Sequence, residues 1–545
     1  MNADETFEKI TKDSLDKLLE SNPDFATNLG LHEPYDSLMP NASTEHTMSD
    51  IRLLEETVKL LKSSVKREEL NDQHRIELEV LENAVEQWKF GFYEQRTHEL
   101  DPDGLSLLGG LVFIMFTRNY APLEKRVDAI AARIEKTPKY LEEFRSRFEN
   151  SQPVKLWTEM AIETAQNMQG LFAFVMHAAK GQVSDKVHER LSKALASAEP
   201  VFKAHMEWLQ SLRQKTVENY ALGKEKFEKL IRLRDLGLTS AEILELGKKY
   251  LSELKVERAK IADQIAPGKP VEEVMKAIES KAPKTFDEAL EYTRKTMEEA
   301  RKFVQEEGIA TVYAEDVLLV EETPAYLVPV IPFAAMTMPA KFDKPQIGIY
   351  IVTRPKDTAN LGKHLNYHGV RNTAVHEAYP GHFLQGSVSN RGSLVNILAQ
   401  GAETTEGWAH YCEQLMAEKG FTKDLETQLI RVNDMIWRAV RIIVDVKLSR
   451  GEMSFDEAVQ MLMQETGMSK EGATAEVKRY TQTPGYPLSY LLGKHLILQL
   501  KEDIKKKMGS KFSERFFHDT VTANGYLPIS LLRKVFEQKL RHAPP

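Results

Sequence analysis

The stretch TAVHEAYPGHFLQ, residues Thr373–Gln385, decides how the backbone folds around two histidines of this chain. It holds a His-Glu pair beginning at His376, and a second histidine, His382, follows six positions later. In an unbroken helix each residue turns about 100°, so the two imidazoles would point about 120° apart and lie about 9 Å apart along the axis. Pro380 removes a helical hydrogen bond, and Gly381 adds backbone freedom. The Pro-Gly pair therefore predicts a break in the helix that returns His382 to the face of His376.

The same stretch is close to the motif H-E-x-x-H, in which two histidines one helical turn apart bind zinc and the glutamate acts as a general base. The chain has three other His-Glu pairs, at His32, His98 and His188, and none has a second histidine close downstream. The extended match at His376 therefore indicates a metal site with a detour between its two histidines.

A third metal ligand is expected on a following helix, where the segment ETTEGWAHYCEQLM offers Glu403, Glu406 and Glu413. Glu406 is the strongest candidate because it follows His382 by 24 residues, a separation found in zinc peptidases that take a glutamate from the next helix. Two histidines, a carboxylate and an open coordination position are typical of a catalytic zinc site. The sequence thus predicts one Zn²⁺ per chain, held by His376, His382 and Glu406, with manganese and cobalt as alternatives.

The composition is that of an ordinary globular protein of 545 residues, enough for two or three lobes or one large helical body with a cleft. The net charge of −8 is spread along the chain, so no nucleic-acid partner is expected. The single cysteine, Cys412, cannot form an internal disulfide, and no signal-peptide pattern is visible at the N-terminus. The longest apolar run, Leu105–Phe116, is too short to span a bilayer. We therefore expect a cytoplasmic protein without a membrane partner, of open oligomeric state.

Apolar residues recur at helical spacing through most of the chain, for example at Leu429, Val432, Ile436, Val440 and Ile443. The stretch from Val317 to Thr353 is instead rich in proline and β-branched residues, which predicts short strands. The expected fold is mostly α, a large helical two-lobed body with a central cleft and a small antiparallel β-sheet beside the active-site helix. The expected domains are an N-terminal helical lobe, 1–270, and a catalytic lobe, 271–545, with the sheet at about 312–353 and the zinc site at 376–406. One continuous domain is the alternative.

Five blocks of the sequence resemble the signature blocks of domain-of-unknown-function family 885. In chain order they are NPDFATNLGLHEPYDSLMP, HEAYPGHFLQ, TEGWAHYCEQLM, RYTQTPGYPLSYLLGK and NGYLPISLL. The resemblance covers nearly the whole chain, and its H-E-A-x-P-G-H block is the most specific. It implies a helical zincin-like metallopeptidase, distantly similar to angiotensin-converting enzyme and the thermostable carboxypeptidases. One departure is Tyr486, where the family block usually holds glutamine, and it bears on substrate preference.

Roles follow for the residues around the expected zinc. Glu377, next to the first ligand, is the expected general base. Tyr490 resembles the tyrosine that follows the zinc helices in converting-enzyme-like peptidases, so it is the expected donor to the oxyanion. The strand Ile347–Thr353 is expected to pair with an extended peptide by edge addition. The expected substrate-binding residues, for which structural roles are the plain alternatives, are Arg479, Tyr480, Tyr486 and His368.

The resulting hypothesis is a zinc-dependent metallopeptidase that hydrolyses peptide bonds of short peptides, in the manner of a carboxypeptidase or an oligopeptidase. Two alternatives stay open at this point. One is a zinc hydrolase of a non-peptide amide, and the other is a non-catalytic helical binding protein with a vestigial metal site. Against a vestigial site, Glu377 and all three expected ligands are present.

Overall fold

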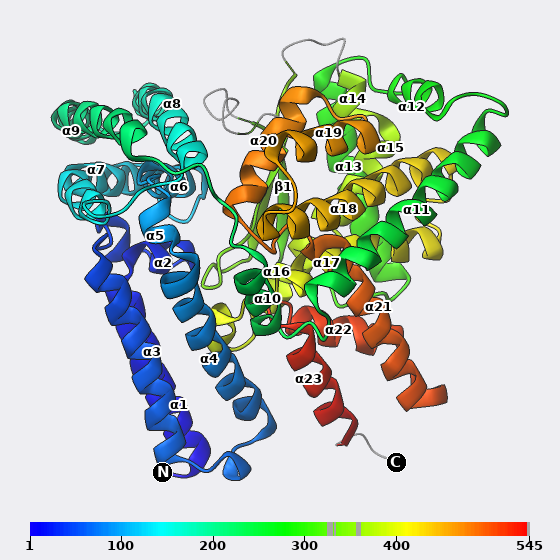
Figure 1. The fold of residues 1–545 in the computed structure, drawn as a ribbon, viewed down its shortest axis with the longest axis horizontal. Helices are drawn as coiled ribbons and strands as arrows, with labels where there is room; N and C mark the ends of the chain where they lie inside the picture. Colours follow the sequence, from blue (N-terminus) through cyan, green and yellow to red (C-terminus); the bar gives the residue numbers. More distant parts are fainter. Residues whose placement is uncertain (324–330, 332–333, 356–360, 542–545) are drawn as a thin grey trace. The chain divides into compact units, whose positions relative to one another are not determined.

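The structure, a computed structural model, describes residues 1–323, 331, 334–355 and 361–541. The chain forms two compact units, which can be followed in Figure 1 by the colours that run along the sequence. Unit 1 comprises Met1–Tyr220 with the short segment Ala340–Asp343, and unit 2 comprises Ala221–Pro339 and Lys344–Pro545. The units divide at residue 220, earlier in the chain than the lobe boundary at residue 270 suggested by loop composition.

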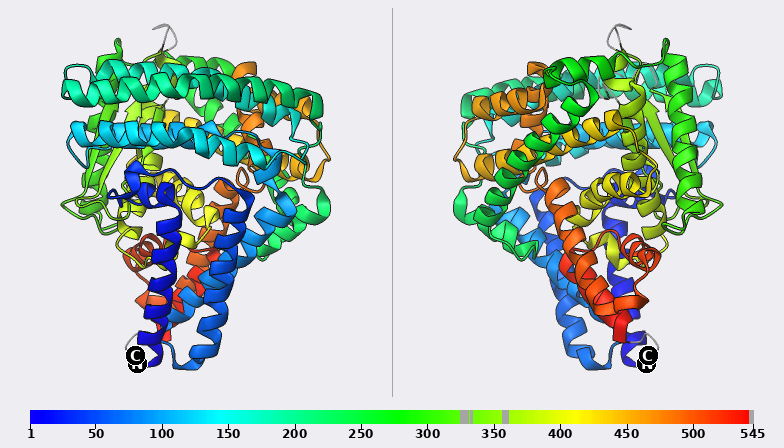
Figure 2. Two further views of the ribbon diagram at one scale, coloured as in Figure 1. Left: turned by 90° about the vertical axis from the view of Figure 1, so that its left-hand side faces the viewer. Right: turned by 90° about the vertical axis from the view of Figure 1, so that its right-hand side faces the viewer.

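Unit 1 is built from helices that bury their apolar faces against one another. Leu15 and Leu18 of the first helix, for example, are fully or almost fully buried, as expected for a stripe at helical spacing. The later helices of the unit, α7 to α9, run crosswise to α1, α3 and α4 (Figure 2). The helices of unit 1 are α1 (Ala3–Ser21), α2 (Pro23–Asn28), α3 (Thr44–Ser64), α4 (Asp72–Phe90), α5 (Thr97–Leu100), α6 (Leu105–Thr117), α7 (Leu123–Ser146), α8 (Lys155–Ala179) and α9 (Asp185–Leu212).

The long apolar run of the sequence forms helix α6, which buries side chains such as Leu108 and Val112. Within the described part of the chain, no single helix is long and apolar enough to cross a bilayer. The segments Asp72–Leu100 and Leu105–Thr117 meet the criteria of length and composition only as a pair, and that pair is bent by 95°.

Unit 2 holds the remaining helices around α18, whose predicted apolar stripe is buried along its whole length. Helix α11 packs along α18, and α17 packs along α21. The helices of unit 2 are α10 (Lys224–Leu233), α11 (Ser240–Ile265), α12 (Val271–Glu279), α13 (Phe286–Glu306), α14 (Leu361–Leu365), α15 (Tyr367–Glu377), α16 (His382–Ser389), α17 (Ala402–Lys419), α18 (Leu425–Arg450), α19 (Phe455–Thr466), α20 (Lys470–Gln482), α21 (Ser489–Met508), α22 (Glu514–Ala523) and α23 (Ile529–Arg541).

Two glycines bring the backbones of α17 and α21 into direct contact. A Cβ on Gly407 would lie 2.3 Å from the backbone carbon of Gly493, and a Cβ on Gly493 would lie 2.1 Å from the carbonyl oxygen of Glu403. Any larger residue would push the helices apart. This contact matters for the site, because α17 carries Glu406 and α21 carries Tyr490.

The small sheet of unit 2 is mixed rather than antiparallel. Its strands β1 (Val317–Glu322), β2 (Ala334–Thr337) and β3 (Ile347–Val352) have the order β1-β3-β2, with β1 parallel and β2 antiparallel to β3. The chain runs back along β2 before β3 enters between the other two strands, so β1 and β3 point the same way. The expected edge addition of a peptide to Ile347–Thr353 is therefore wrong, because both sides of β3 are already paired. The predicted strand region also includes 324–330 and 332–333, which lie outside the described residues.

The sheet lies against the helix that begins at His382. A Cβ on Gly348 of β3 would lie 2.5 Å from the ring of Phe383 on α16, so the strand and the helix are in close contact. The expectation of a mostly helical fold with a small sheet beside the histidine helices is confirmed.

Candidate metal centre

The helix breaks between the two histidines, as the Pro-Gly pair predicts. Helix α15 ends at Glu377, and α16 begins at His382. The N–H of Gly381 donates to the carbonyl of Val375 (3.1 Å), and a Cβ on Gly381 would lie only 1.9 Å from the carbonyl oxygen of His376. Glycine permits this close return of the backbone. As a result, the two imidazole rings lie 4.9 Å apart between centroids, with their planes at 87°.

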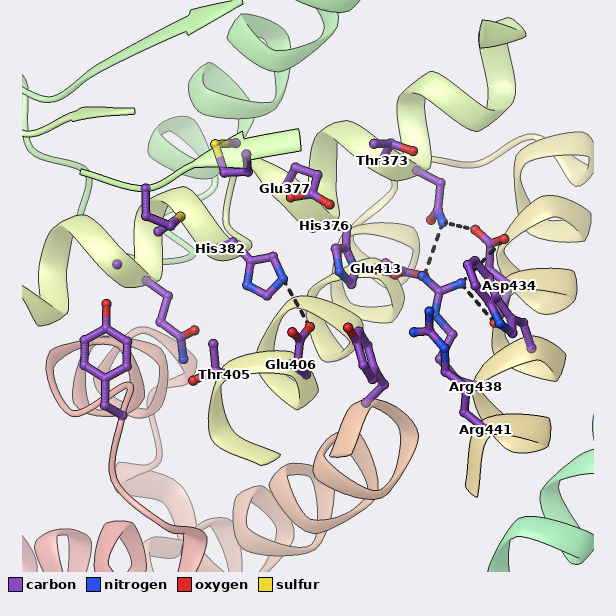
Figure 3. A pocket seen from close by; sticks show the side chains of 18 residues that line it. Thr373, His376, Glu377, His382, Thr405, Glu406, Glu413, Asp434, Arg438 and Arg441 are labelled. Carbon is purple, nitrogen blue, oxygen red and sulfur yellow. Dashed lines mark hydrogen bonds and ion pairs between the residues drawn. The ribbon is translucent and has the colours of Figure 1, made fainter. Parts of the chain in front are cut away.

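Helix α17 holds the turn in place and supplies a third donor. The indole N–H of Trp408 donates to the carbonyl of Pro380 (2.8 Å). Two residues before this tryptophan, Glu406 places its Oε2 atom 3.3 Å from Nε2 of His382. The ligand atoms of His376, His382 and Glu406 all lie within 4.8 Å of one another (Figure 3). The break in α15–α16 and the approach of α17 therefore bring the three expected ligands together.

The spacing of these three atoms fits a zinc ion. Atoms no more than 4.8 Å apart lie within about 2.8 Å of a common point, and zinc binds nitrogen and oxygen at about 2.0–2.2 Å. Side-chain shifts of less than about 1 Å would complete the set. Among the residues that the structure describes, no other group of three His, Cys, Asp or Glu side chains lies so close together.

The other two glutamates considered as the third ligand, Glu403 and Glu413, make different contacts. Glu403 is buried and forms an ion pair with Arg234, the residue that follows α10. Glu413 places Oε1 2.7 Å from Nδ1 of His376, which leaves Nε2 of that imidazole as the nitrogen available to an ion. Of the three glutamates considered as the third ligand, Glu406 alone belongs to the cluster of donors.

Glu413 is itself held by a buried polar network. Burial raises the pKa of its carboxyl, but His410 and His376 outweigh burial and hold this pKa well below its usual value. Asn372 donates to Oε2 of Glu413 (3.2 Å) and to Asp434 on α18 (3.0 Å). The orientation of the first histidine is thus determined by residues from three helices, α15, α17 and α18.

The second oxygen of Glu406 accepts a hydrogen bond from the hydroxyl of Tyr486. Burial opposes ionisation of Glu406, but the contacts with His382 and Tyr486 outweigh it and lower the pKa of Glu406 to about 2. Asp445 fixes the loop that carries Tyr486 by accepting from two of its backbone N–H groups, at 2.9 and 3.0 Å. Tyr486 therefore holds a metal-ligand candidate, and it does not line the adjoining cavity.

The three donors open onto a cavity of about 510 Å³ inside unit 2. Glu377 and Tyr490, the expected base and the expected oxyanion donor, both line this cavity. No described residue forms a hydrogen bond or an ion pair with Glu377, and Figure 3 shows it beside the two histidines. Burial raises the pKa of Tyr490, so its hydroxyl keeps its proton at neutral pH. Both side chains stand where they can reach a bound molecule.

Three residues expected to bind substrate lie outside the cavity wall. Arg479 pairs with Glu476 (2.9 Å), and the hydroxyl of Tyr480 donates to the same carboxylate (2.6 Å). His368 lies near the other end of α15, where its Nδ1 is 2.8 Å from Asp424. In this structure their contacts are those of a salt-bridged arginine, a core tyrosine and a histidine that ties α15 to the start of α18.

Among the cavity residues that the sequence interpretation missed are two arginines of α18, Arg438 and Arg441. That helix was interpreted only through its apolar stripe, which faces the core. The signal was present in the segment MIWRAVRIIV, where two arginines three residues apart interrupt an otherwise apolar run. Arginines at this spacing lie on one face of a helix, and a buried charged face calls for an explanation.

This fold and site define a class of mostly helical protein with a cluster of two histidines and one carboxylate at a cavity. The chain belongs to the family of bacterial proteins of unknown function called DUF885, which matches residues 23–535. No curated protein matches the chain.

Two solved structures share the fold over nearly their whole length. One is a candidate lipoprotein of unknown function from Shewanella oneidensis, with 22% identity and a TM-score of 0.79, covering 97% of this chain and 99% of that chain. The other is a candidate lipoprotein from Colwellia psychrerythraea, with 19% identity and a TM-score of 0.86, covering 100% of both chains. At these identities the likeness concerns the fold.

The expected cytoplasmic location is wrong. The Shewanella and Colwellia proteins are both described as candidate lipoproteins, and that description contradicts a cytoplasmic location. The expectation rested on the lone Cys412 and on an N-terminus without a signal-peptide pattern. A lone cysteine excludes an internal disulfide, but it is compatible with any compartment.

Proposed function

We propose that the chain is a zinc-dependent peptidase that hydrolyses short peptides. The observation that carries this proposal is the convergence of His376, His382 and Glu406 at one cavity, beside the carboxylate of Glu377, with which no described residue pairs. A cavity of about 510 Å³ is of the size that holds small ligands, which favours a short flexible peptide over a folded protein. The family resemblance to helical zincin-like peptidases points the same way.

The donor set suits zinc, since imidazole nitrogens and a carboxylate are its usual ligands in hydrolases. His376, His382 and Glu406 would hold the ion. When bound, zinc supplies Lewis-acid chemistry, which makes water a stronger nucleophile and a peptide carbonyl a better electrophile. Glu413 keeps the first histidine in the tautomer that can bind a metal, because it accepts from Nδ1 and leaves Nε2 unprotonated.

Two cavity residues of the chain would move and stabilise charge. Glu377 has no described partner to satisfy its carboxylate, so it is available to take a proton from the attacking water and to deliver it to the leaving nitrogen. Tyr490 keeps its phenolic proton and would donate a hydrogen bond to the oxygen that becomes negatively charged during attack. Glu377 is thus the proposed general base and acid, and Tyr490 the proposed oxyanion donor.

The test combines metal content with peptide hydrolysis on the full chain. We expect about one zinc per chain by elemental mass spectrometry, and loss of hydrolysis on chelation that added zinc restores. Glu377→Gln should keep the metal and lower kcat by about 10²–10⁴-fold, whereas His382→Ala should lose both. His495→Ala is the matched control, because this histidine of α21 bonds Tyr250 (2.9 Å) and does not line the cavity.

Two results would contradict the proposal in different ways. A stoichiometric metal together with hydrolysis of small amides but not of any peptide would indicate a different hydrolase on the same scaffold. A wild-type protein that binds no zinc, even after reconstitution, would show that the two histidines and Glu406 do not form a metal site.

A further inference from the structure

One wall of the cavity is formed by two arginines from successive turns of α18. Arg441 is held by several contacts: the central carbon of its guanidinium lies 4.1 Å from the ring centroid of Trp437 and 4.4 Å from that of Tyr490. Its Nε donates to the hydroxyl of Tyr480 (2.8 Å), and Nη2 donates to Glu476 (3.0 Å). Contact with two aromatic rings favours a cation at this position. The side chain is therefore pre-organised.

Arg438, one turn earlier, is less completely bonded. Its Nη1 donates to the backbone carbonyl of Asp434 (3.1 Å) and lies 3.6 Å from that residue's carboxylate. Its Nε is buried and has no hydrogen-bond partner among the described residues. Its Nη2 also has no hydrogen-bond acceptor among the described residues, and unlike Nε it is not fully buried, so this atom can donate to an acceptor that enters the cavity.

The surrounding carboxylates do not neutralise this wall. Glu476 is shared between Arg441 and Arg479, so two guanidinium groups divide one carboxylate. Asp434 lies 3.6 Å from Nη1 of Arg438 and also accepts from Asn372 (3.0 Å). Three guanidinium groups therefore share two carboxylates. This wall of the cavity, beside the metal-ligand cluster, carries a net positive charge from its guanidinium groups.

We propose that Arg438 and Arg441 bind the C-terminal carboxylate of the substrate, so that the protein acts as a carboxypeptidase. Guanidinium groups bind carboxylates through paired, charge-assisted hydrogen bonds. Figure 3 shows both arginines gathered with Asp434 on one side of the three metal-ligand candidates. The inference rests on the proposed peptidase function, and it adds that cleavage occurs at the end of a chain.

The remainder of the cavity fits this direction of binding. The other lining residues include Met336, Met338, Gln385 and Tyr526, none of which carries a charge at neutral pH. Such uncharged side chains can accept the part of the peptide that precedes the cleaved bond. The charged lining residues besides the arginines and the metal-ligand candidates are acidic, Glu377, Glu413 and Asp434, so they offer no competing site for a carboxylate. The chain terminus would thus be directed to Arg438 and Arg441.

The first experiment compares two peptides of one sequence, one with a free C-terminal carboxylate and one with a C-terminal amide. Wild-type protein should cleave the free acid with a kcat/KM about 10- to 100-fold above that of the amide, the worth of hydrogen bonds to a charged group. Arg438→Gln and Arg441→Gln should bring this ratio close to one by raising KM for the acid. Arg479→Gln is the matched control, because it shares Glu476 but does not line the cavity, and it should leave the ratio unchanged.

A second readout does not depend on turnover. The same two peptides are titrated into Glu377→Gln protein by calorimetry, with and without Arg438→Gln in the same chain. The acid should bind about 10- to 100-fold more tightly than the amide, and the added substitution should abolish that difference. Arg438→Gln leaves the Glu476 ion pairs intact, so this arm remains informative if Arg441→Gln fails to fold.

The outcomes separate this inference from the peptidase proposal. Equal cleavage and equal binding of acid and amide would overturn the carboxylate subsite while the peptidase function stands. A preference for amidated peptides with an aspartate or glutamate beside the cleaved bond would overturn the inference. It would show that the arginines bind an acidic side chain of the substrate and not its C-terminal carboxylate. Failure to cleave either peptide, with zinc bound, would contradict the peptidase function itself.

Discussion

Replacing Gly381 by alanine is the sharpest test of how the two histidines are brought together. The added Cβ would lie 1.9 Å from the carbonyl oxygen of His376 and 2.4 Å from that of Val375, although such contacts are not made below 3.0 Å. Both obstacles are backbone atoms, so the turn must open by about 1 Å, and we expect a cost near 3 kcal/mol in the free energy of unfolding. Because Gly381 precedes His382, the same shift carries that imidazole away from the cluster. Metal–ligand distances tolerate about 0.2 Å, so zinc affinity should fall by at least about 100-fold.

The assay measures the free energy of unfolding by urea titration of the metal-free protein, and zinc affinity by competition with a chromogenic chelator. Gly386→Ala, in the helix α16 that follows this turn, is the matched control. Its Cβ would meet the terminal methyl of Met338 at 2.1 Å, the end of a flexible side chain that can move, so zinc affinity should stay within about threefold. The reasoning is refuted if Gly381→Ala binds one zinc at wild-type affinity with unchanged stability.

Three further predictions follow from contacts around the site. Glu413→Ala should lower zinc affinity by about 10- to 100-fold, measured by chelator competition, because nothing would then orient His376. Burial opposes the ionised form of Glu476, but Arg441 and its neighbours outweigh it and lower its pKa from 4.5 to about 2. Its carboxylate therefore contributes about 3 kcal/mol to the free energy of unfolding above pH 4.5, and this contribution is lost as the pH falls towards 2. The free energies of unfolding of wild type and Glu476→Gln, measured by urea titration, should therefore converge at low pH. Gly407→Ala should cost about 3 kcal/mol in the same assay, because its Cβ meets the α21 backbone.

Much of the candidate site could be predicted from the sequence because its key signals are local. The break at Pro380–Gly381 follows from the covalent geometry of two residues, and the structure has helix ends on either side of it. The choice of Glu406 followed from its spacing after His382, and in the structure it is the glutamate that joins the cluster. The helical stripe of α18 was likewise visible as a period in the sequence.

Other features of the site could not be predicted this way. Arg479 and Tyr480 were expected to bind substrate, yet the arginines that line the cavity are Arg438 and Arg441 of α18. Which face of α20 or α18 meets the cavity depends on how each helix is rotated about its axis by its neighbours. The order of the sheet strands was missed for a similar reason, since strand periodicity does not reveal which strand enters the middle.

The sequence by itself determined the helical class, the family, the interruption between the two histidines and the identity of the candidate metal ligands. These depend on the conformational preferences of neighbouring residues and on patterns repeated along one segment. Only the tertiary structure decided that Glu413 stands behind His376, that Tyr486 holds Glu406, and that two arginines complete the cavity wall. These contacts join side chains far apart in the sequence, and their positions are determined by close packing between helices, which no local pattern encodes.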